Sequence, residues 1–146
     1  MILHVARFAD LDVATLYALL RLRTDIFVVE QRCPYPELDG RDLEPGTRHV
    51  WLAPERSDPH AYLRVLAEPD GSHRIGRVCT AEKARGQGLS ARLVAAALEL
   101  IGDAPSVLDA QSYLVEFYLG FGFTQSGAEF VEDGIPHVPM RRNPAP

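Results

Sequence analysis

The pattern of apolar and polar positions in the first third of the chain predicts a strand followed by a long helix. Apolar residues among polar neighbours indicate a half-buried strand over residues 2–8. Apolar residues at helical spacing then predict a helix over residues 12–30, with Asp10 or Asp12 as its N-cap. The end of this helix, residues 26–29, is β-branched and aromatic, which predicts an irregular last turn.

Short apolar runs bounded by turn residues predict the remaining strands. Residues 33–47, rich in proline, glycine and acidic residues, read as a loop, and a loop of that length in a compact domain is often functional. The turn at Asp133-Gly134 predicts a closing hairpin, and a tail is expected from Asn143 onward. The predicted strands cover residues 49–53, 61–67, 74–80, 107–110, 121–130 and 135–141.

Two more helices follow from the pattern. One begins at Leu89 and ends before Gly102 and Pro105, and a short one covers residues 112–119. The first strands then form an antiparallel meander that leads into the strand at 74–80. The whole order of elements predicts a mixed α/β fold.

The stretch from Arg74 to Leu98 joins a buried strand, a glycine turn and a helix start. The first turn of a helix leaves backbone N–H groups without partners, and the helix dipole places positive charge there. Gly86 and Gly88 allow close approach to the main chain, and Arg85 adds charge. The turn therefore predicts a phosphate site. An ordinary helix start is the alternative. The Rossmann pattern fits loosely, and the Walker pattern is missing its Lys-Ser/Thr.

Two motifs resemble the GNAT N-acetyltransferases. Residues 85–90, Arg-Gly-Gln-Gly-Leu-Ser, resemble the R/Q-x-x-G-x-G/A loop of that family, with Ser90 where Gly or Ala is usual. Residues 111–123 resemble the later N-x-x-A-x-x-F-Y-x-x-x-G-F motif, with Gln111 for Asn and Leu114 for Ala. Residues 27–35, 39–40 and 132–137 resemble the ElaA-like branch, so the resemblance covers nearly the whole chain.

This resemblance implies the fold and the cofactor. The expected fold is an α/β (α+β) acyl-CoA N-acyltransferase domain over residues 1–146, with a central mixed, mostly antiparallel sheet flanked by helices. Acetyl-CoA is the implied co-substrate, and no metal is expected. The implied cofactor-binding residues are Val78, Cys79, Thr80, Arg85, Gly86, Gln87, Gly88, Leu89, Ser90 and Gln111. For residues 78–80 a role as core strand residues is the alternative, and Cys79 is expected to be a small buried residue rather than a nucleophile.

The family transfers its acetyl group directly to an amine, which needs a general acid and a base. Tyr118 matches the tyrosine that protonates the departing thiolate in the family, and a phenol is protonated at neutral pH. Aromatic packing is the alternative role of Tyr118. Glu30 and His137 are candidates on the acceptor side. The alternative for Glu30 is an ion pair with Arg23 or Arg32, and for His137 a structural role.

Composition narrows the partners. The chain has 146 residues, 47% of them hydrophobic, and a formal net charge of −5, which argues against a nucleic-acid partner. Two cysteines make no disulfide scaffold or metal site, and no leader or membrane-spanning run is found. A cytoplasmic setting, no membrane partner and a small-molecule amine acceptor are therefore expected, and a homodimer is compatible with the sequence.

The sequence thus favours an acetyl-CoA-dependent N-acetyltransferase. A non-catalytic acyl-CoA-binding module is the contrasting hypothesis, supported only by Gln111 in place of asparagine. An unrelated nucleotide-binding domain is a weaker third interpretation.

Overall fold

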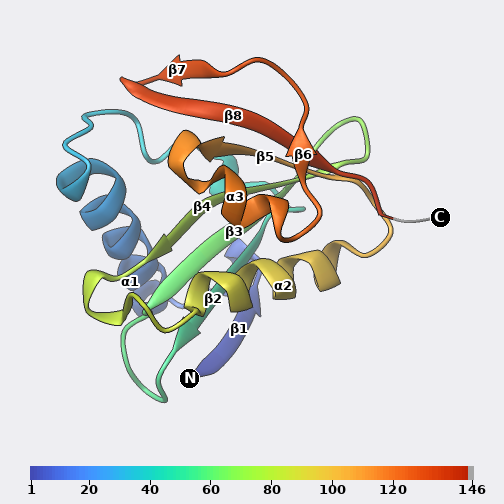
Figure 1. The fold of residues 1–146 in the computed structure, drawn as a ribbon. Coiled ribbons are helices and arrows are strands. Elements are labelled where there is room, and N and C mark those ends of the chain that lie inside the picture. Colours follow the sequence, from blue (N-terminus) through green and yellow to red (C-terminus); the bar gives the residue numbers. More distant parts are fainter. Residues whose placement is uncertain (145–146) are drawn as a thin grey trace.

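The structure, a computed structural model, describes residues 1–144 and is built on one large sheet (Figure 1). Within those residues the sheet has eight strands. Their bounds are β1 (Ile2–Ala6), β2 (Arg48–Ala53), β3 (Ala61–Ala67), β4 (His73–Thr80), β5 (Ser106–Gln111), β6 (Thr124–Gln125), β7 (Phe130–Glu132) and β8 (Ile135–Arg142).

Helices connect the strands and cover the sheet. The α-helices are α1 (Val13–Thr24), α2 (Leu89–Ile101) and α3 (Val115–Leu119). A π-helical turn continues α1, and short 3-10 turns occur elsewhere. These turns are Asp25–Glu30 (π), Phe8–Asp10, Arg41–Leu43, Glu82–Ala84 and Ser112–Leu114.

The strand order is β1-β2-β3-β4-β5-β8-β6, and β7 also pairs with β8, at residues 135–137. Strands β1 to β4 form an antiparallel meander, β4 and β5 are parallel, and β5 is antiparallel to β8. The predicted mixed, mostly antiparallel sheet flanked by helices is therefore confirmed.

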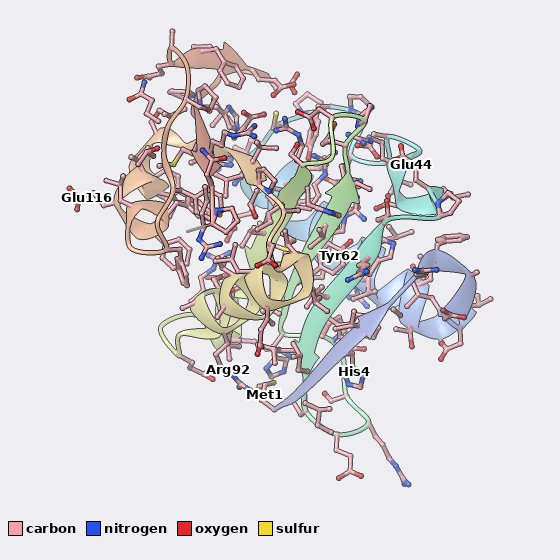
Figure 2. All side chains as sticks on the ribbon, turned by 90° about the vertical axis from the view of Figure 1, so that its right-hand side faces the viewer. Met1, His4, Glu44, Tyr62, Arg92 and Glu116 are labelled. Atoms are coloured by element: carbon pink, nitrogen blue, oxygen red, sulfur yellow. The ribbon has the colours of Figure 1, made fainter. Side chains whose placement is uncertain are left out.

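The two faces of the sheet pack against different helices. Successive residues of a strand point to opposite faces. On β3, Leu63 joins the core under α2 with Leu93, whereas Tyr62 joins a second core with Leu19 of α1 and Trp51. Figure 2 shows Tyr62 deep among the packed side chains of the sheet. The helices α1 and α2 thus cover opposite faces.

The predicted first helix is confirmed, including its irregular end. The carboxylate of Asp12 accepts a hydrogen bond from the backbone N–H of Thr15 at 2.7 Å, so Asp12 is the N-cap. Beyond Thr24 the chain widens into the π-helical turn, where β-branched and aromatic residues crowd the backbone. This turn carries Glu30 to Arg85, just beyond the end of β4.

The strand predicted over residues 121–130 is wrong. The backbone N–H groups of Gly122 and Phe123 donate to the carbonyls of Leu119 and Tyr118, so the chain still turns at the end of α3. Gly122 has a φ of 89°, a left-handed conformation that ends a helix and not one that continues a strand. Only the two short strands β6 and β7 form in this segment.

The predicted hairpin at the end of the chain is confirmed. Asp133 and Gly134 both have positive φ, 51° and 78°, as a two-residue hairpin turn requires. Of the predicted tail, Asn143 accepts a hydrogen bond from the guanidinium of Arg141, and residues 145–146 lie outside the described part. No helix in residues 1–144 is long and apolar enough to span a membrane.

Candidate active site

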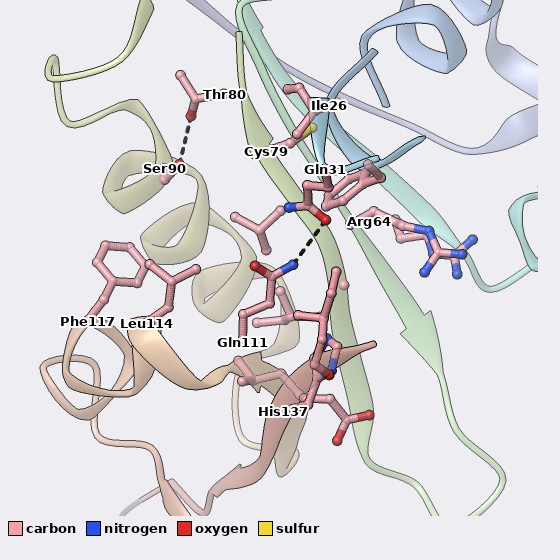
Figure 3. Close-up of a pocket in the computed structure, with 18 of the residues that line it drawn as sticks. Ile26, Gln31, Arg64, Cys79, Thr80, Ser90, Gln111, Leu114, Phe117 and His137 are labelled. Atoms are coloured by element: carbon pink, nitrogen blue, oxygen red, sulfur yellow. Dashed lines mark hydrogen bonds between the residues drawn. The ribbon is translucent and has the colours of Figure 1, made fainter. Parts of the chain in front are cut away.

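A large cleft opens where β4 and β5 part. These parallel strands pair only at His73–Ser106 and Arg74–Val107, and beyond these two pairs they diverge. The resulting cleft has a volume of about 1030 Å³ and is lined by β4, β5, the start of α2, the π-helical turn and the β7–β8 hairpin. Figure 3 shows its interior. All predicted site residues except Gln87 line it.

The glycine turn forms one end of the cleft. Gly86 and Gly88 have φ values of 79° and 73°, and a Cβ on either would meet no atom within 4 Å. Gly88 is the N-cap of α2 and has no side chain to cap it, so the first-turn N–H groups face open space. The hydroxyls of Thr80 and Ser90 are 2.8 Å apart and tie β4 to α2 (Figure 3). This turn has the geometry of an anion cradle.

Arg85 of this cradle already holds a carboxylate. Its Nη1 and Nη2 donate to the two carboxylate oxygens of Glu30 at 2.8 and 2.7 Å, and its Nε donates to the carbonyl of Thr80 at 3.2 Å. The hydrogen bond from Arg85 lowers the pKa of Glu30, so this carboxylate is ionised at neutral pH. The predicted alternative partners of Glu30, Arg23 and Arg32, were wrong. The real partner lies 55 residues away along the chain.

Tyr118 lies at the wall of the cleft and is 5% exposed. Its ring makes edge contacts with Phe117 and Phe123, with centroids 5.0 and 6.1 Å away. Burial raises the pKa of Tyr118 to about 12. Its hydroxyl forms no hydrogen bond with any described residue. The residue therefore both packs in an aromatic cluster and presents a protonated phenol to the cleft.

Gln111 and His137 are cross-strand partners on β5 and β8. The side-chain amide of Gln111 donates to the amide oxygen of Gln31 at 3.4 Å and bridges the cleft (Figure 3). His137 Nδ1 lies 2.8 Å from the carbonyl of Ile135, which can only accept, so Nδ1 carries the proton. In the neutral ring Nε2 is then the basic nitrogen. The ring stacks on Phe130 at 5.6 Å.

The strand residues 78–80 line the same cleft. The register between β3 and β4 shifts after Tyr62–Cys79, which marks a β-bulge, and Arg77 in this bulge has a φ of 54°. Cys79 is 5% exposed, and burial raises its pKa to about 12. Its thiol is thus protonated, as expected of a small buried residue.

A closed ring of ion pairs on one side of the cleft was not predicted. Three arginines from α1, β3 and β4 alternate with three carboxylates from the loop over residues 33–47. We call these six residues the ion-pair ring. The N–O distances around it are Arg23–Glu37 (2.7 Å), Glu37–Arg77 (2.8 Å), Arg77–Asp39 (3.5 Å), Asp39–Arg64 (2.5 Å), Arg64–Asp42 (3.1 Å) and Asp42–Arg23 (2.8 Å).

The ion-pair ring is largely buried. Arg23, Glu37, Asp42 and Arg64 are each at most 5% exposed. Burial alone would raise the pKa of Asp42, but hydrogen bonds and charge from Arg23 and Arg64 outweigh it, and the pKa is lowered. One feature of the sequence could have indicated this ring: Arg23 and Arg64 stand at positions of α1 and β3 where the pattern places apolar residues. Within residues 1–144 no group of side chains is arranged to hold a metal ion.

Comparison with known proteins identifies the family. The family model of the acetyltransferase (GNAT) domain matches residues 30–144. The chain belongs to the GNAT acetyltransferase family. Its match to this family model begins at Glu30 and so includes the glycine cradle, Tyr118 and the last hairpin. The predicted resemblance to the GNAT family is confirmed.

Relatives within the GNAT family place the chain in its ElaA-like branch. A UPF0039 protein of Mycobacterium tuberculosis is 54% identical over 136 residues, which cover 91% of this chain and 87% of that protein. Protein ElaA of Escherichia coli is 41% identical over 140 residues, covering 92% of this chain and 91% of ElaA.

Solved structures agree with this family. The crystal structure of Escherichia coli ElaA matches with a TM-score of 0.91 and 38% identity, covering 97% of this chain and 99% of ElaA. That of an acyl-CoA N-acyltransferase from Pseudomonas aeruginosa matches with a TM-score of 0.89 and 42% identity, at the same coverage. An aminoglycoside 6'-N-acetyltransferase complexed with coenzyme A, 12% identical, shares the fold with a TM-score of 0.75.

Proposed function

We propose that this protein is an acetyl-CoA-dependent N-acetyltransferase that transfers the acetyl group directly to a primary amine of a small acceptor. The observation that carries the proposal is the single cleft between the diverging strands β4 and β5. It joins the anion cradle at residues 85–90 to the buried, protonated Tyr118. Membership of the GNAT family supports the same reaction class.

The cradle fits the pyrophosphate of coenzyme A. Gly86 and Gly88 leave open space over the main chain, and the N–H groups at the start of α2 can donate to phosphate oxygens. The diverging edge of β4 at residues 78–80 offers backbone groups to the pantetheine arm, and Gln111 faces it from β5. Bound acetyl-CoA supplies an activated thioester.

The reacting groups of the protein then have defined roles. The amine nitrogen forms a bond to the thioester carbon, and the carbon–sulfur bond breaks. Tyr118 donates its phenolic proton to the departing thiolate. Nε2 of His137 takes the proton that the amine must lose, because Nδ1 is already committed to the carbonyl of Ile135. Glu30 serves better as a counter-ion of Arg85 than as a base, since its pKa is lowered.

The proposed setting follows the sequence. Both cysteines are free and buried, which suits a reducing cytoplasmic environment. We propose a small-molecule acceptor because the loop over residues 33–47 is fixed by the ion-pair ring and borders the cleft. No nucleic-acid or membrane partner is proposed.

A binding assay and a turnover assay on one sample test this function. We expect acetyl-CoA to bind by titration calorimetry and free CoA thiol to be released with at least one class of primary amine. Replacing Tyr118 by Phe should lower kcat about 100-fold or more, the typical contribution of a general acid, and leave the Kd for acetyl-CoA unchanged. Tyr17→Phe is the matched control, since Tyr17 is 70% exposed on α1, away from the cleft.

The outcomes separate the two hypotheses. Binding without thiol release from any amine favours a non-catalytic acyl-CoA-binding module. No binding of acetyl-CoA at all contradicts the assignment of the cradle.

A further inference from the structure

The half of the cleft that is lined by the first part of β4 contains a glycine that the backbone does not require. Gly76 lies inside β4, and its φ is outside the left-handed region that favours glycine. A Cβ built on Gly76 would meet no atom within 4 Å, so close packing does not require glycine either. Gly76 lines the cleft. A glycine inside a strand weakens the strand and often marks a place where a ligand approaches the backbone.

Arg77, on one side of this glycine, is held in place and has a free donor. Its Nε donates to the carboxylate of Glu37 at 2.8 Å and its Nη2 to the carbonyl of the same residue at 3.1 Å. The guanidinium carbon lies 5.5 Å from the ring centroid of Tyr35. Nη2 also lies 3.5 Å from the carboxylate of Asp39, and Nη1 donates no hydrogen bond to any residue in 1–144. The planar guanidinium is thus fixed on two sides with one edge unused.

Arg74, on the other side, is arranged in the same way. Its Nε is 3.3 Å from the carboxylate of Glu68, and its Nη1 donates to Asp109 at 3.2 Å. Its Nη2 donates no hydrogen bond to any residue of the described chain. Arg74 and Arg77 therefore flank the bare backbone of Gly76 with one unused nitrogen each, and both line the cleft.

The opposite wall of this half carries the opposite charge. Glu132 and Asp133, at the tip of the β7–β8 hairpin, line the cleft and form no ion pair within residues 1–144. His137 lies on β8 after them. On the β4 side Arg64, Arg74 and Arg77 line the cleft and are partly balanced by Asp39 and Asp109, whereas the acidic hairpin residues have no paired cation in the described chain. A carboxylate therefore prefers the arginine side, and an ammonium group prefers the hairpin. The two walls thus favour a ligand that carries both charges.

We propose that the acceptor is an amine that also carries a carboxylate, an amino-acid-type zwitterion. Its carboxylate lies over Gly76 between Arg74 and Arg77, where guanidinium donors match carboxylate geometry. Its amine then points toward His137. This assignment rests on the proposed function and specifies its substrate class.

Matched acid and amide pairs test the assignment. The protein saturated with CoA is titrated calorimetrically at pH 7 with glycine, L-lysine, L-methionine and 4-aminobutanoate, and with the primary amide of each. At least one acid should bind tenfold or more tightly than its amide. A panel in which no acid binds better than its amide overturns the assignment, whether the amides bind better or neither member binds.

Variants locate the carboxylate. Arg77→Gln should bring the acid-to-amide affinity ratio close to one, while the Kd for acetyl-CoA stays within twofold. Gly76→Ala fills the open space and should weaken the binding of the acid at least tenfold with no loss of thermal stability. This variant therefore tests the site even if Arg77→Gln folds poorly. Arg21→Gln, on the exposed side of α1, is the control and should keep the ratio. An unchanged ratio in both cleft variants overturns the site.

Turnover separates this inference from the proposed function. Thiol release that favours amides over acids contradicts the zwitterion subsite and leaves the acetyltransferase intact. Selective acid binding without thiol release from any amine supports the subsite and contradicts the enzymatic function.

Discussion

In the cradle at residues 85–90, the guanidinium of Arg85 can pair with either Glu30 or a bound phosphate. All three side-chain nitrogens of Arg85 already donate hydrogen bonds, Nη1 and Nη2 to Glu30 and Nε to the carbonyl of Thr80. A phosphate that uses Arg85 must displace Glu30 or accept a carboxylate nearby. We therefore expect Glu30 to weaken the binding of an anionic cofactor at this cradle.

Replacing Glu30 by Gln should strengthen CoA binding about three- to tenfold, because unit charges a few ångströms apart near a protein surface interact by one to a few kcal/mol. Titration calorimetry measures the change, and the gain should shrink in high salt. Glu129→Gln, outside the cleft lining, is the control. Weaker binding in Glu30→Gln would show instead that the pair holds the cradle in shape.

Tyr118 offers a second prediction at this scale, on stability. Tyr118→Phe keeps the ring contacts with Phe117 and Phe123 and removes a hydroxyl without a partner in residues 1–144. The free energy of unfolding should change by less than about 0.5 kcal/mol, whereas Tyr118→Ala should lose about 3–5 kcal/mol by leaving a cavity. Urea denaturation measures both. A large loss in the Phe variant would mean that the hydroxyl has a structural partner.

Among the elements, the loop over residues 33–47 owes its shape to distant partners. The ion-pair ring fixes its three carboxylates against α1, β3 and β4. Removing one partner from a buried ion pair leaves an uncompensated charge, which is far more costly than losing a surface pair. The loop is thus part of the rigid frame of the cleft.

Asp42→Asn should destabilise the fold by about 3–5 kcal/mol at pH 7. The pKa of Asp42 is lowered in the folded state, so its contribution is complete above the unfolded pKa of about 4 and is lost as pH falls below that value. The difference between wild type and variant should therefore shrink between pH 5 and pH 2. Denaturant unfolding at several pH values tests this, with the exposed Asp103→Asn as control. A difference that is independent of pH would contradict the role of the Asp42 charge.

The glycine turn before α2 allows a matched comparison. Gly88 and Gly71 both have positive φ, 73° and 89°, and open space for a Cβ. Alanine at either position should cost a similar 1–2 kcal/mol, the strain of the left-handed conformation. Only Gly88→Ala should also weaken CoA binding, at least tenfold, because its methyl group occupies the cradle. Equal CoA affinity in the two variants would place the pyrophosphate elsewhere.

Most elements could be predicted from the sequence, but their tertiary partners could not. Periodicity and turn residues identify β4, the glycine turn and α2, because local patterns determine them. The strand predicted over 121–130 failed because the chain still turns after α3, and the left-handed conformation of Gly122 closes that turn. The partners of Glu30 and of the ion-pair ring lie tens of residues away, and charge pairing at that distance leaves no local pattern.

On the scale of the whole molecule, two pairs of residues join the halves of the sheet. Strands β1 to β4 form one antiparallel block, and β5 with β6 to β8 forms another. Within residues 1–144 the backbone pairs between them are His73–Ser106 and Arg74–Val107, and the side chains of Arg74 and Asp109 add an ion pair. The cleft and all its chemistry lie at this junction.

Binding of CoA should therefore protect the junction selectively. Hydrogen exchange with mass spectrometry should show slower exchange for residues 78–80, 85–90 and 108–111 in the complex. Strands β1 and β2 lie away from the cleft lining and should be unchanged. Protection spread evenly over the sheet would indicate general stabilisation rather than a ligand at the junction.

The divergence of β4 and β5 also bears on how ligands enter and leave the cleft. Each strand is held on its outer side by an antiparallel ladder, β4 to β3 with one bulge and β5 to β8 without interruption. The width of the cleft is thus set by the hydrogen-bond pattern of the sheet and does not depend on the closure of two domains. For the proposed reaction we therefore expect reactants to be selected by their fit to a cleft of fixed width, and product release to be governed by the breaking of ligand contacts rather than by a domain motion.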